Sequence, residues 1–124
     1  KESLEGCFFR EQAFIPTFQK WKGEYCGGLQ VHVTDLRRYN PVLVTVALLL
    51  AVKKTAGADF QFKEPPYEYE TEKMPFDILS GSSELREAIE KDVSLSEIKE
   101  SWSEGHREYR EVFSSVSRYP EERP

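Results

Sequence analysis

The segment LQVHVTDLRRYNPVLVTVALLLAVKK, residues 29–54, decides the fold because it joins two different hydrophobic patterns. Its beginning alternates: Leu29, Val31 and Val33 are apolar, and the residues between them are polar. Strict alternation predicts a half-buried β-strand, since neighbouring side chains of a strand point to opposite faces. The apolar run after Pro41 does not alternate, and it predicts a helix that is covered on most sides.

Asn40 and Pro41 mark the beginning of this helix. Asparagine is a favoured N-cap residue, and proline is favoured at the first helical position, where its missing N–H leaves nothing unpaired. We expect the helix to run through residues 42–54 and to end near Gly57, because glycine commonly follows the last helical turn. A short strand is expected at residues 59–63, which would complete a parallel strand–helix–strand unit.

The residues before this segment predict another strand and a loop. Residues 6–15 are rich in phenylalanine and are bounded by glycine and proline, which is typical of a strand. A loop that carries Thr17, Lys20 and Trp21 follows. The glycine pair at residues 27–28 permits a bulge or a close approach of another backbone.

The rest of the chain is expected to be mainly helical. Residues 67–70 alternate tyrosine and glutamate and are expected to be extended, whereas residues 75–79 are expected to form a helical turn. A short amphipathic helix is expected at residues 84–91. Ser94, followed three positions later by Glu97, has the sequence pattern of a capping box that opens the last helix.

The last helix is expected to be long and amphipathic, with a bend at Gly105. Its apolar residues recur at steps of three, four and seven, at Leu95, Ile98, Trp102, Tyr109, Phe113 and Val116. Strands that precede helices favour the α+β class: a small mixed or antiparallel sheet with helices packed on it, one buried apolar helix and this C-terminal amphipathic helix. Residues 1–119 are expected to form a single domain, and residues 120–124 a frayed tail.

Charge is unevenly distributed along the 124 residues, whose net charge is −5. Residues 1–63 carry nine basic and six acidic side chains, whereas residues 64–124 carry eight and sixteen. The acidic second half argues against nucleic acid as a partner, because phosphate binding needs a basic face. The mildly basic first half could receive an anionic small ligand. No membrane partner is expected, because the apolar run is shorter than the ~20 residues of a membrane span.

The two cysteines, Cys7 and Cys26, are too few for a disulfide scaffold. One bridge between them and two buried free thiols are both open interpretations. No cysteine and histidine cluster has the spacing of a zinc site, and no phosphate-binding loop or nucleophile motif is present. We therefore expect no metal and no cofactor.

One face of the expected strand lines up an amide, an imidazole and a hydroxyl, at Gln30, His32 and Thr34, and Asp35 follows. A strand holds its side chains firmly, so such a row suits a polar ligand. A solvated sheet face gives the same alternation and is the simpler interpretation of the pattern by itself.

Two further segments carry residues that suit a sugar. In the loop, Lys20 can pair with a carboxylate and Trp21 can stack on a sugar ring, although aromatic residues of a loop also serve a core. If the tyrosine–glutamate segment is extended, Glu68 and Glu70 share one face. A catalytic carboxylate pair must approach a glycosidic bond from different directions, so we expect no catalytic pair here.

The order of several sequence pieces resembles one protein family. The pieces are FIPTFQK at residues 14–20, GEYCGGLQVHVTD at 23–35, PV with a leucine-rich helix from 41, PYEYE at 66–70 and PFDILSG at 75–81. Together they resemble the C-terminal domain of the NamZ-type exo-β-N-acetylmuramidases. The resemblance covers roughly residues 6–102, and its most specific part is residues 26–35.

The resemblance implies a two-domain bacterial glycosidase that removes terminal N-acetylmuramic acid from peptidoglycan fragments. It implies that the sugar lies between this region and an N-terminal Rossmann-like domain that holds the catalytic glutamates. This chain alone would then be inactive. Its partners would be that domain and a muropeptide or amino-sugar ligand, in the periplasm or outside the cell. The positions carried over as cleft-lining are Thr17, Lys20, Gln30, His32, Thr34, Asp35, Tyr67 and Glu68.

Other interpretations stay open. The chain could be a structural or interaction domain that packs against its partner without touching substrate. An autonomous enzyme that uses His32 with either Asp35 or Glu68 is the least favoured interpretation. If the chain does contact N-acetylmuramic acid, the lactyl carboxylate of that sugar needs a cation, and the candidates are Lys20, Arg37 and Arg38.

Overall fold

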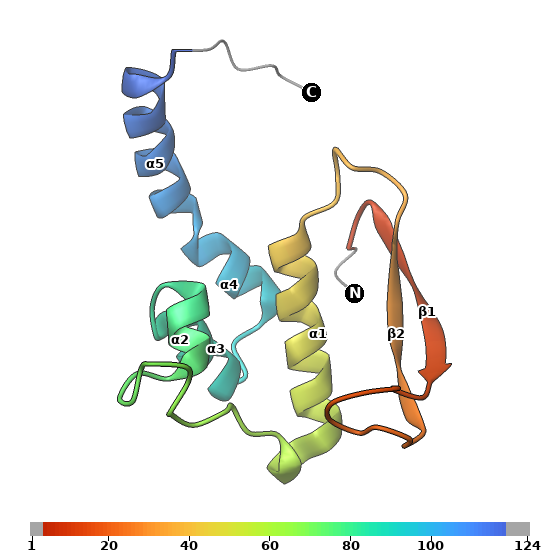
Figure 1. Cartoon of the computed structure of the whole chain (residues 1–124). Helices are drawn as coiled ribbons and strands as arrows, with labels where there is room; N and C mark the ends of the chain where they lie inside the picture. The colour runs from red at the N-terminus through yellow and green to blue at the C-terminus, as the bar shows by residue number, and fades with distance from the viewer. Residues whose placement is uncertain (1–3, 119–124) are drawn as a thin grey trace. The chain divides into compact units, whose positions relative to one another are not determined.

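The computed structural model describes residues 4–118, which divide into two compact units. The first, residues 4–41, is a β-hairpin, and the second, residues 42–118, is helical (Figure 1). The strands are β1 (Cys7–Phe14) and β2 (Cys26–Val33), and the helices are α1 (Pro41–Ala56), the 3-10 turn η1 (Gly57–Asp59), α2 (Pro75–Ser80), α3 (Glu84–Glu90), α4 (Leu95–Ser101) and α5 (Ser103–Val116). The chain is α+β, as the sequence predicted. The tail expected at residues 120–124 lies outside the described residues.

The two strands pair in an antiparallel ladder without interruption, from Cys7 opposite Val33 to Phe14 opposite Cys26. The glycine pair at residues 27–28 lies inside this ladder, so no bulge forms there. β2 therefore begins three residues before the alternating run that predicted it, because pairing with β1 continues through the glycines. The observed sheet is antiparallel, which is one of the two arrangements that the sequence left open.

The register excludes a bridge between the two cysteines, and both side chains are half-buried rather than buried. Cys7 and Cys26 are both free thiols, and they lie near opposite ends of the hairpin and on opposite faces. Seven residues of ladder separate their positions, which corresponds to about 23 Å along a strand. A disulfide needs Cα atoms within ~7 Å, so the hairpin excludes a bridge between these two residues.

Gly6 closes the base of the hairpin. Its carbonyl oxygen accepts hydrogen bonds from the N–H groups of Thr34, at 2.8 Å, and Asp35, at 3.2 Å. The backbone of Gly6 has a φ of +74°, and a Cβ at this position would lie 2.5 Å from the Asp35 carbonyl oxygen and 2.6 Å from the Tyr39 nitrogen. Only glycine fits this conformation and this spacing.

Helix α1 begins at Pro41, as the asparagine–proline pair predicted, and Val44 and Val46 are its buried residues. Together with η1 it forms the continuous helical segment Pro41–Asp59, which is long and apolar enough to cross a membrane by length and composition. We expected the apolar run to be too short to span a membrane. The length of the helix contradicts this expectation, because the helix continues beyond the apolar run. A core helix passes the same test, so the absence of a membrane partner stays a prediction.

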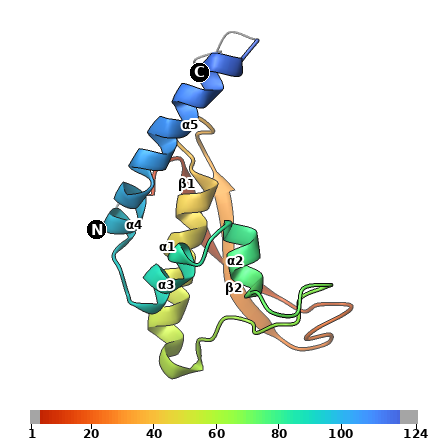
Figure 2. The same ribbon diagram turned by 90° about the vertical axis from the view of Figure 1, so that its left-hand side faces the viewer.

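Helices α2, α3 and α4 lie beside α1 in both ribbon views (Figures 1 and 2). The core of this unit includes Ile89 of α3 and Ile98 of α4, which are both buried. Lys53 of α1 donates hydrogen bonds to the Glu90 carbonyl oxygen, at 2.9 Å, and to Asp92 Oδ1, at 2.6 Å. These bonds fasten α1 to the connection between α3 and α4.

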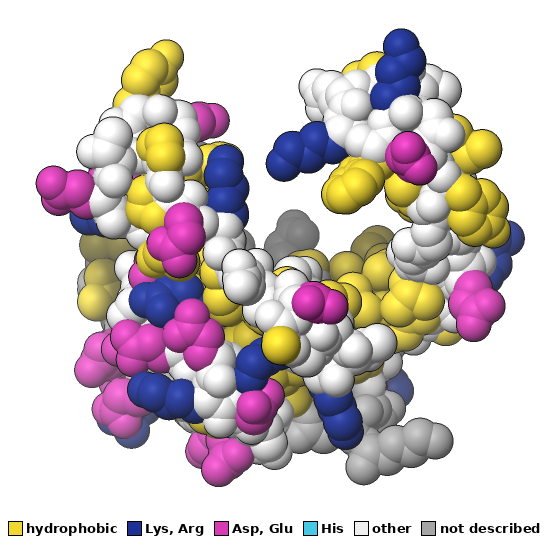
Figure 3. All heavy atoms as spheres, turned by 90° about the horizontal axis from the view of Figure 1, so that it is seen from below, with side chains coloured by type: hydrophobic (Ala, Val, Ile, Leu, Met, Phe, Trp, Pro, Cys, Tyr) yellow, Lys and Arg dark blue, Asp and Glu magenta, His cyan; other side chains and the backbone are white. Residues whose placement is uncertain are grey.

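Arg86 joins α2 to α3. Its Nε and Nη2 donate to the two carboxylate oxygens of Asp77, at 2.8 and 2.9 Å, and its Nη1 donates to Glu90. The hydrogen bond with Asp77 is the main cause that raises the pKa of Arg86 above its ordinary value. Acidic and basic side chains are intermingled on the helical unit (Figure 3), so ion pairs offset part of the acidic excess of this half.

The strand expected at residues 59–63 is absent. Phe60 packs edge-on against Phe62, with ring centroids 5.2 Å apart, and Phe62 packs against Phe76 of α2 at 4.7 Å. The alternating aromatic residues therefore form a cluster with a helix rather than pairing with another strand. As a result, the expected parallel strand–helix–strand unit does not form.

The last helical region is divided at Trp102 into α4 and α5, and α5 continues through Gly105 without a break. The capping box forms as predicted: the Ser94 hydroxyl accepts from the Glu97 N–H at 3.3 Å, and the Glu97 carboxylate accepts from the Ser94 N–H at 3.1 Å. The Ser94 hydroxyl also donates a hydrogen bond to the Glu97 carboxylate. This bond first, and then the one from the Ser94 N–H, hold the pKa of Glu97 below its ordinary value. The Trp102 N–H bonds to the Lys99 carbonyl at 3.3 Å, which tightens the last turn of α4 and ends it.

Candidate functional site

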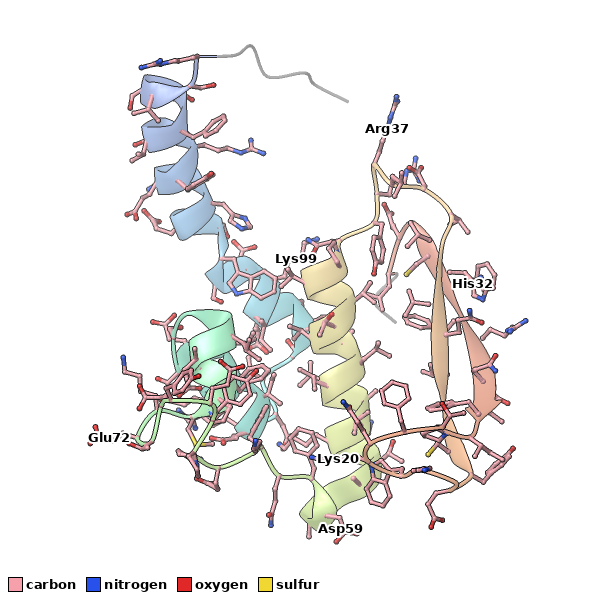
Figure 4. All side chains as sticks on the ribbon, viewed as in Figure 1. Lys20, His32, Arg37, Asp59, Glu72 and Lys99 are labelled. Carbon is pink, nitrogen blue, oxygen red and sulfur yellow. The ribbon has the colours of Figure 1, made fainter. Side chains whose placement is uncertain are left out.

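An aromatic pair marks one end of the hairpin. Phe8 lies directly opposite His32 in the ladder, and their rings stack with centroids 4.7 Å apart and planes inclined by 6°. The ring of His32 projects from β2 (Figure 4). Its Nε2 is covered and has no hydrogen-bond partner among residues 4–118. A flat aromatic surface beside a polar row is a common way to hold a ligand that is apolar on one face.

The next position on the same face holds a cation. Arg10 lies opposite Gln30, and its Nη2 donates to Gln30 Oε1 at 3.0 Å and to Gln12 Oε1 at 2.8 Å. Both acceptors are neutral amides. This hairpin face, which we call the Arg10 face and define by Phe8, Arg10, Gln12, Gln30 and His32, thus joins a ring pair, amides and a guanidinium.

Thr34 and Asp35 lie just beyond the end of β2 and belong mainly to the turn that closes the hairpin. Their N–H groups bond to the Gly6 carbonyl oxygen. The Asp35 carboxylate accepts from the Arg37 N–H at 2.9 Å and lies 3.7 Å from Arg38 Nε. Asp35 therefore stabilises the turn, and its ion pair with Arg38 partly neutralises the charge of that guanidinium.

Thr17 and Lys20 lie in the loop at the opposite end of the hairpin, and both are exposed. The loop is closed by a hydrogen bond from the Gly23 N–H to the Pro16 carbonyl oxygen, at 2.9 Å. Six residues of β2 separate His32 from the end of the strand next to this loop, which corresponds to about 20 Å. The structure thus does not bring these loop residues beside His32.

Tyr67 and Glu68 belong to the helical unit, and their segment is a tight turn rather than an extended strand. Tyr67 forms an isolated antiparallel bridge with Glu70, and Glu68 has a φ of +53°. Glu70 Oε1 accepts the N–H groups of Glu72, at 2.8 Å, and Lys73, at 3.2 Å. These backbone bonds lower the pKa of Glu70. The Glu70 carboxylate therefore caps this turn, and it does not share one face of an extended strand with Glu68.

The hairpin also has a hollow near the glycine pair. A depression of about 440 Å³ is lined by Glu11, Gln12, Ala13, Tyr25, Gly27 and Gly28. The helical unit has a second depression of about 690 Å³ next to Lys53 and Asp92, which already bond to each other. Within residues 4–118 no three His, Cys, Asp or Glu side chains are grouped as a metal site would need.

The structure thus places Gln30 and His32 together on one strand face and adds Phe8 and Arg10, which sequence reasoning missed. The sequence placed Arg10 in the first expected strand. Which residue of the second strand lies opposite Arg10 depends on the pairing register, and alternation alone does not give that register. Thr34 lies next to this face, beyond the strand end. Asp35 lies in the turn that closes this end of the hairpin, and the remaining expected positions lie in the far loop or in the other unit.

Three comparisons relate the chain to known proteins. A family model described as the C-terminal part of the exo-beta-N-acetylmuramidase NamZ matches residues 1–119. The peptidoglycan beta-N-acetylmuramidase NamZ of Bacillus subtilis is 30% identical over 99 residues, which are 80% of this chain and 22% of that protein. The chain therefore spans about a fifth of this relative.

A solved structure shares the fold. It is that of a DUF1343 family protein from Bacteroides fragilis, and it matches 94% of this chain and 30% of its own length with a TM-score of 0.76. At 22% identity, this likeness shows the fold alone.

Proposed function

The chain belongs to the family of C-terminal domains of the exo-β-N-acetylmuramidase NamZ, and on that premise we propose that it is the sugar-contacting accessory part of a peptidoglycan glycosidase. The family match over residues 1–119 carries this proposal. The relative from B. subtilis is named a peptidoglycan β-N-acetylmuramidase, which gives the substrate class.

The Arg10 face is the surface that best suits this role. The stacked rings of Phe8 and His32 suit the apolar side of a sugar ring, and Gln30 offers an amide for its polar substituents. These side chains stand on two paired strands, which hold them more firmly than a loop would. Thr34, at the end of the row, is a further contact in this proposal.

Hydrolysis itself would belong to a second domain. Glycosidases place two carboxyl groups on either side of the scissile bond. Glu70, which alternation placed on one face with Glu68, already caps its own turn. We therefore propose that an N-terminal domain, as the relative's greater length allows, supplies the acid and the base and closes over the sugar.

Calorimetric titration of the chain with N-acetylmuramic acid tests the proposal. We expect saturable, weak binding with a Kd of about 1 mM, because half of a cleft gives only part of the contacts and ~4 kcal/mol of binding free energy. Sucrose, which also has ring hydroxyls but no acetamido group, is the control and should give no saturable heat. Equal heats for both sugars, or none for N-acetylmuramic acid, would contradict the proposal.

The alternative function is that of a structural or interaction domain. Helix α5 favours it, because all its residues are exposed and its apolar residues form one stripe, at Tyr109, Val112, Phe113 and Val116. Such a stripe suits contact with another protein surface. A chain that folds normally but does not bind the sugar would support this alternative.

A further inference from the structure

We propose that Arg10 is the residue of this chain that receives the lactyl carboxylate of N-acetylmuramic acid, and that it thereby selects this sugar over N-acetylglucosamine. The inference rests on the proposed function and deepens it. The two sugars differ in the lactyl ether, so a cation placed beside the ring discriminates between them through that single carboxylate.

The guanidinium of Arg10 is held in place but remains available. Only its Nη2 has acceptors, the amide oxygens of Gln12 and Gln30. The N–H groups of Nη1 and Nε have no acceptor in the described part of the chain. The free N–H groups of Nε and Nη1 lie on different sides of the planar guanidinium, so each can donate a charge-assisted hydrogen bond to one oxygen of a carboxylate.

The charge of Arg10 is not neutralised. None of the ion pairs formed within residues 4–118 includes Arg10, whereas Arg38, Arg86 and Arg107 each pair with a carboxylate. An anion that binds Arg10 therefore does not have to displace a carboxylate first. Two neutral amides keep the side chain in one orientation, which lowers the entropy that binding would otherwise cost.

The position of Arg10 relative to the stacked rings fits a single sugar. Phe8 and Arg10 are two residues apart on the same face of β1, which corresponds to about 7 Å. A sugar ring that stacks on Phe8 can therefore direct its lactyl substituent toward Arg10. Lys20 is beyond the other end of the strands, and Arg37 lies in the turn after β2 with its side chain pointing away from the hairpin (Figure 4). The other proposed cations are therefore worse placed.

The test compares two sugars and three forms of the chain by calorimetric titration. The unaltered chain should bind N-acetylmuramic acid about tenfold more tightly than N-acetylglucosamine, since a charge-assisted hydrogen bond of ~1.5 kcal/mol corresponds to about one decade in affinity. Arg10→Gln should lose this preference and bind both sugars equally. Lys20→Gln, which removes the same charge from the same hairpin, should retain it.

The outcomes separate this inference from the proposed function. If Arg10→Gln keeps the full preference, or if Lys20→Gln loses it, Arg10 is not the carboxylate site, although the chain still binds the sugar. If the unaltered chain binds neither sugar, the proposed function fails and the assignment of Arg10 fails with it. An exchange-protection map of the hairpin amides, unchanged in Arg10→Gln, excludes unfolding as the cause of a lost preference.

Discussion

Replacing Ile89 with alanine is expected to lower the free energy of unfolding of the helical unit by about 2–5 kcal/mol. Ile89 is 0% exposed and is the most completely buried of the large side chains. Truncation would remove the transfer free energy of its buried methyl and methylene groups and leave a cavity between packed helices. Urea unfolding followed by far-UV circular dichroism measures the loss, because this unit contains the helices.

The control is Ile78→Ala, which makes the same truncation in α2 at a residue that is 42% exposed. It should cost clearly less than Ile89→Ala, since less apolar surface returns to water and water fills the space. Equal losses for the two variants would mean that the core of the helical unit is not centred on α3.

Replacing Gly6 with alanine is expected to destabilise the hairpin by about 2–4 kcal/mol. The positive φ of Gly6 alone costs an alanine ~1–2 kcal/mol. In addition, the new Cβ would overlap the backbone at Asp35 and Tyr39, and backbone atoms cannot rotate away as a side chain would. Amide hydrogen exchange should therefore speed up at Thr34 and along β2, while the helical unit keeps its protection.

Gly23→Ala is the matched control. Gly23 also has a positive φ, of +81°, but a Cβ there would have no neighbour within 4 Å. Its expected cost is therefore the ~1–2 kcal/mol of backbone strain alone. A Gly6→Ala hairpin that exchanges no faster than the Gly23→Ala hairpin would show that the close approach at Gly6 does not matter.

Local chemistry made several elements predictable from the sequence. Asn40 and Pro41 fixed the start of α1, because cap preference depends on adjacent residues only. The capping box of Ser94 and Glu97 is equally local, and it formed as predicted. The class of the fold followed from the order of these elements.

Tertiary packing decided what the sequence did not. Phe60 and Phe62 alternate as strand residues do, but the ring of Phe60 packs against Phe62 and the ring of Phe62 packs against Phe76, which alternation alone does not reveal. Glu68 adopts a positive φ, which is uncommon for glutamate, so the segment expected to be extended became a turn.

The candidate site was predictable only in part for the same reason. Alternation placed Gln30 and His32 on one face, and the structure has them there. Arg10 and Phe8 joined them through the register of the ladder, which is a pairing between distant residues. The distance of Lys20 from His32 also follows from that register and not from the loop sequence.

The central claim is that the Arg10 face of the hairpin contacts the sugar. Its most direct test is to measure intermolecular nuclear Overhauser effects between saturating N-acetylmuramic acid and the isotope-labelled chain. We predict contacts from the sugar ring protons to the rings of Phe8 and His32. Contacts confined to the far loop around Lys20, or to the helical unit, would contradict the claim.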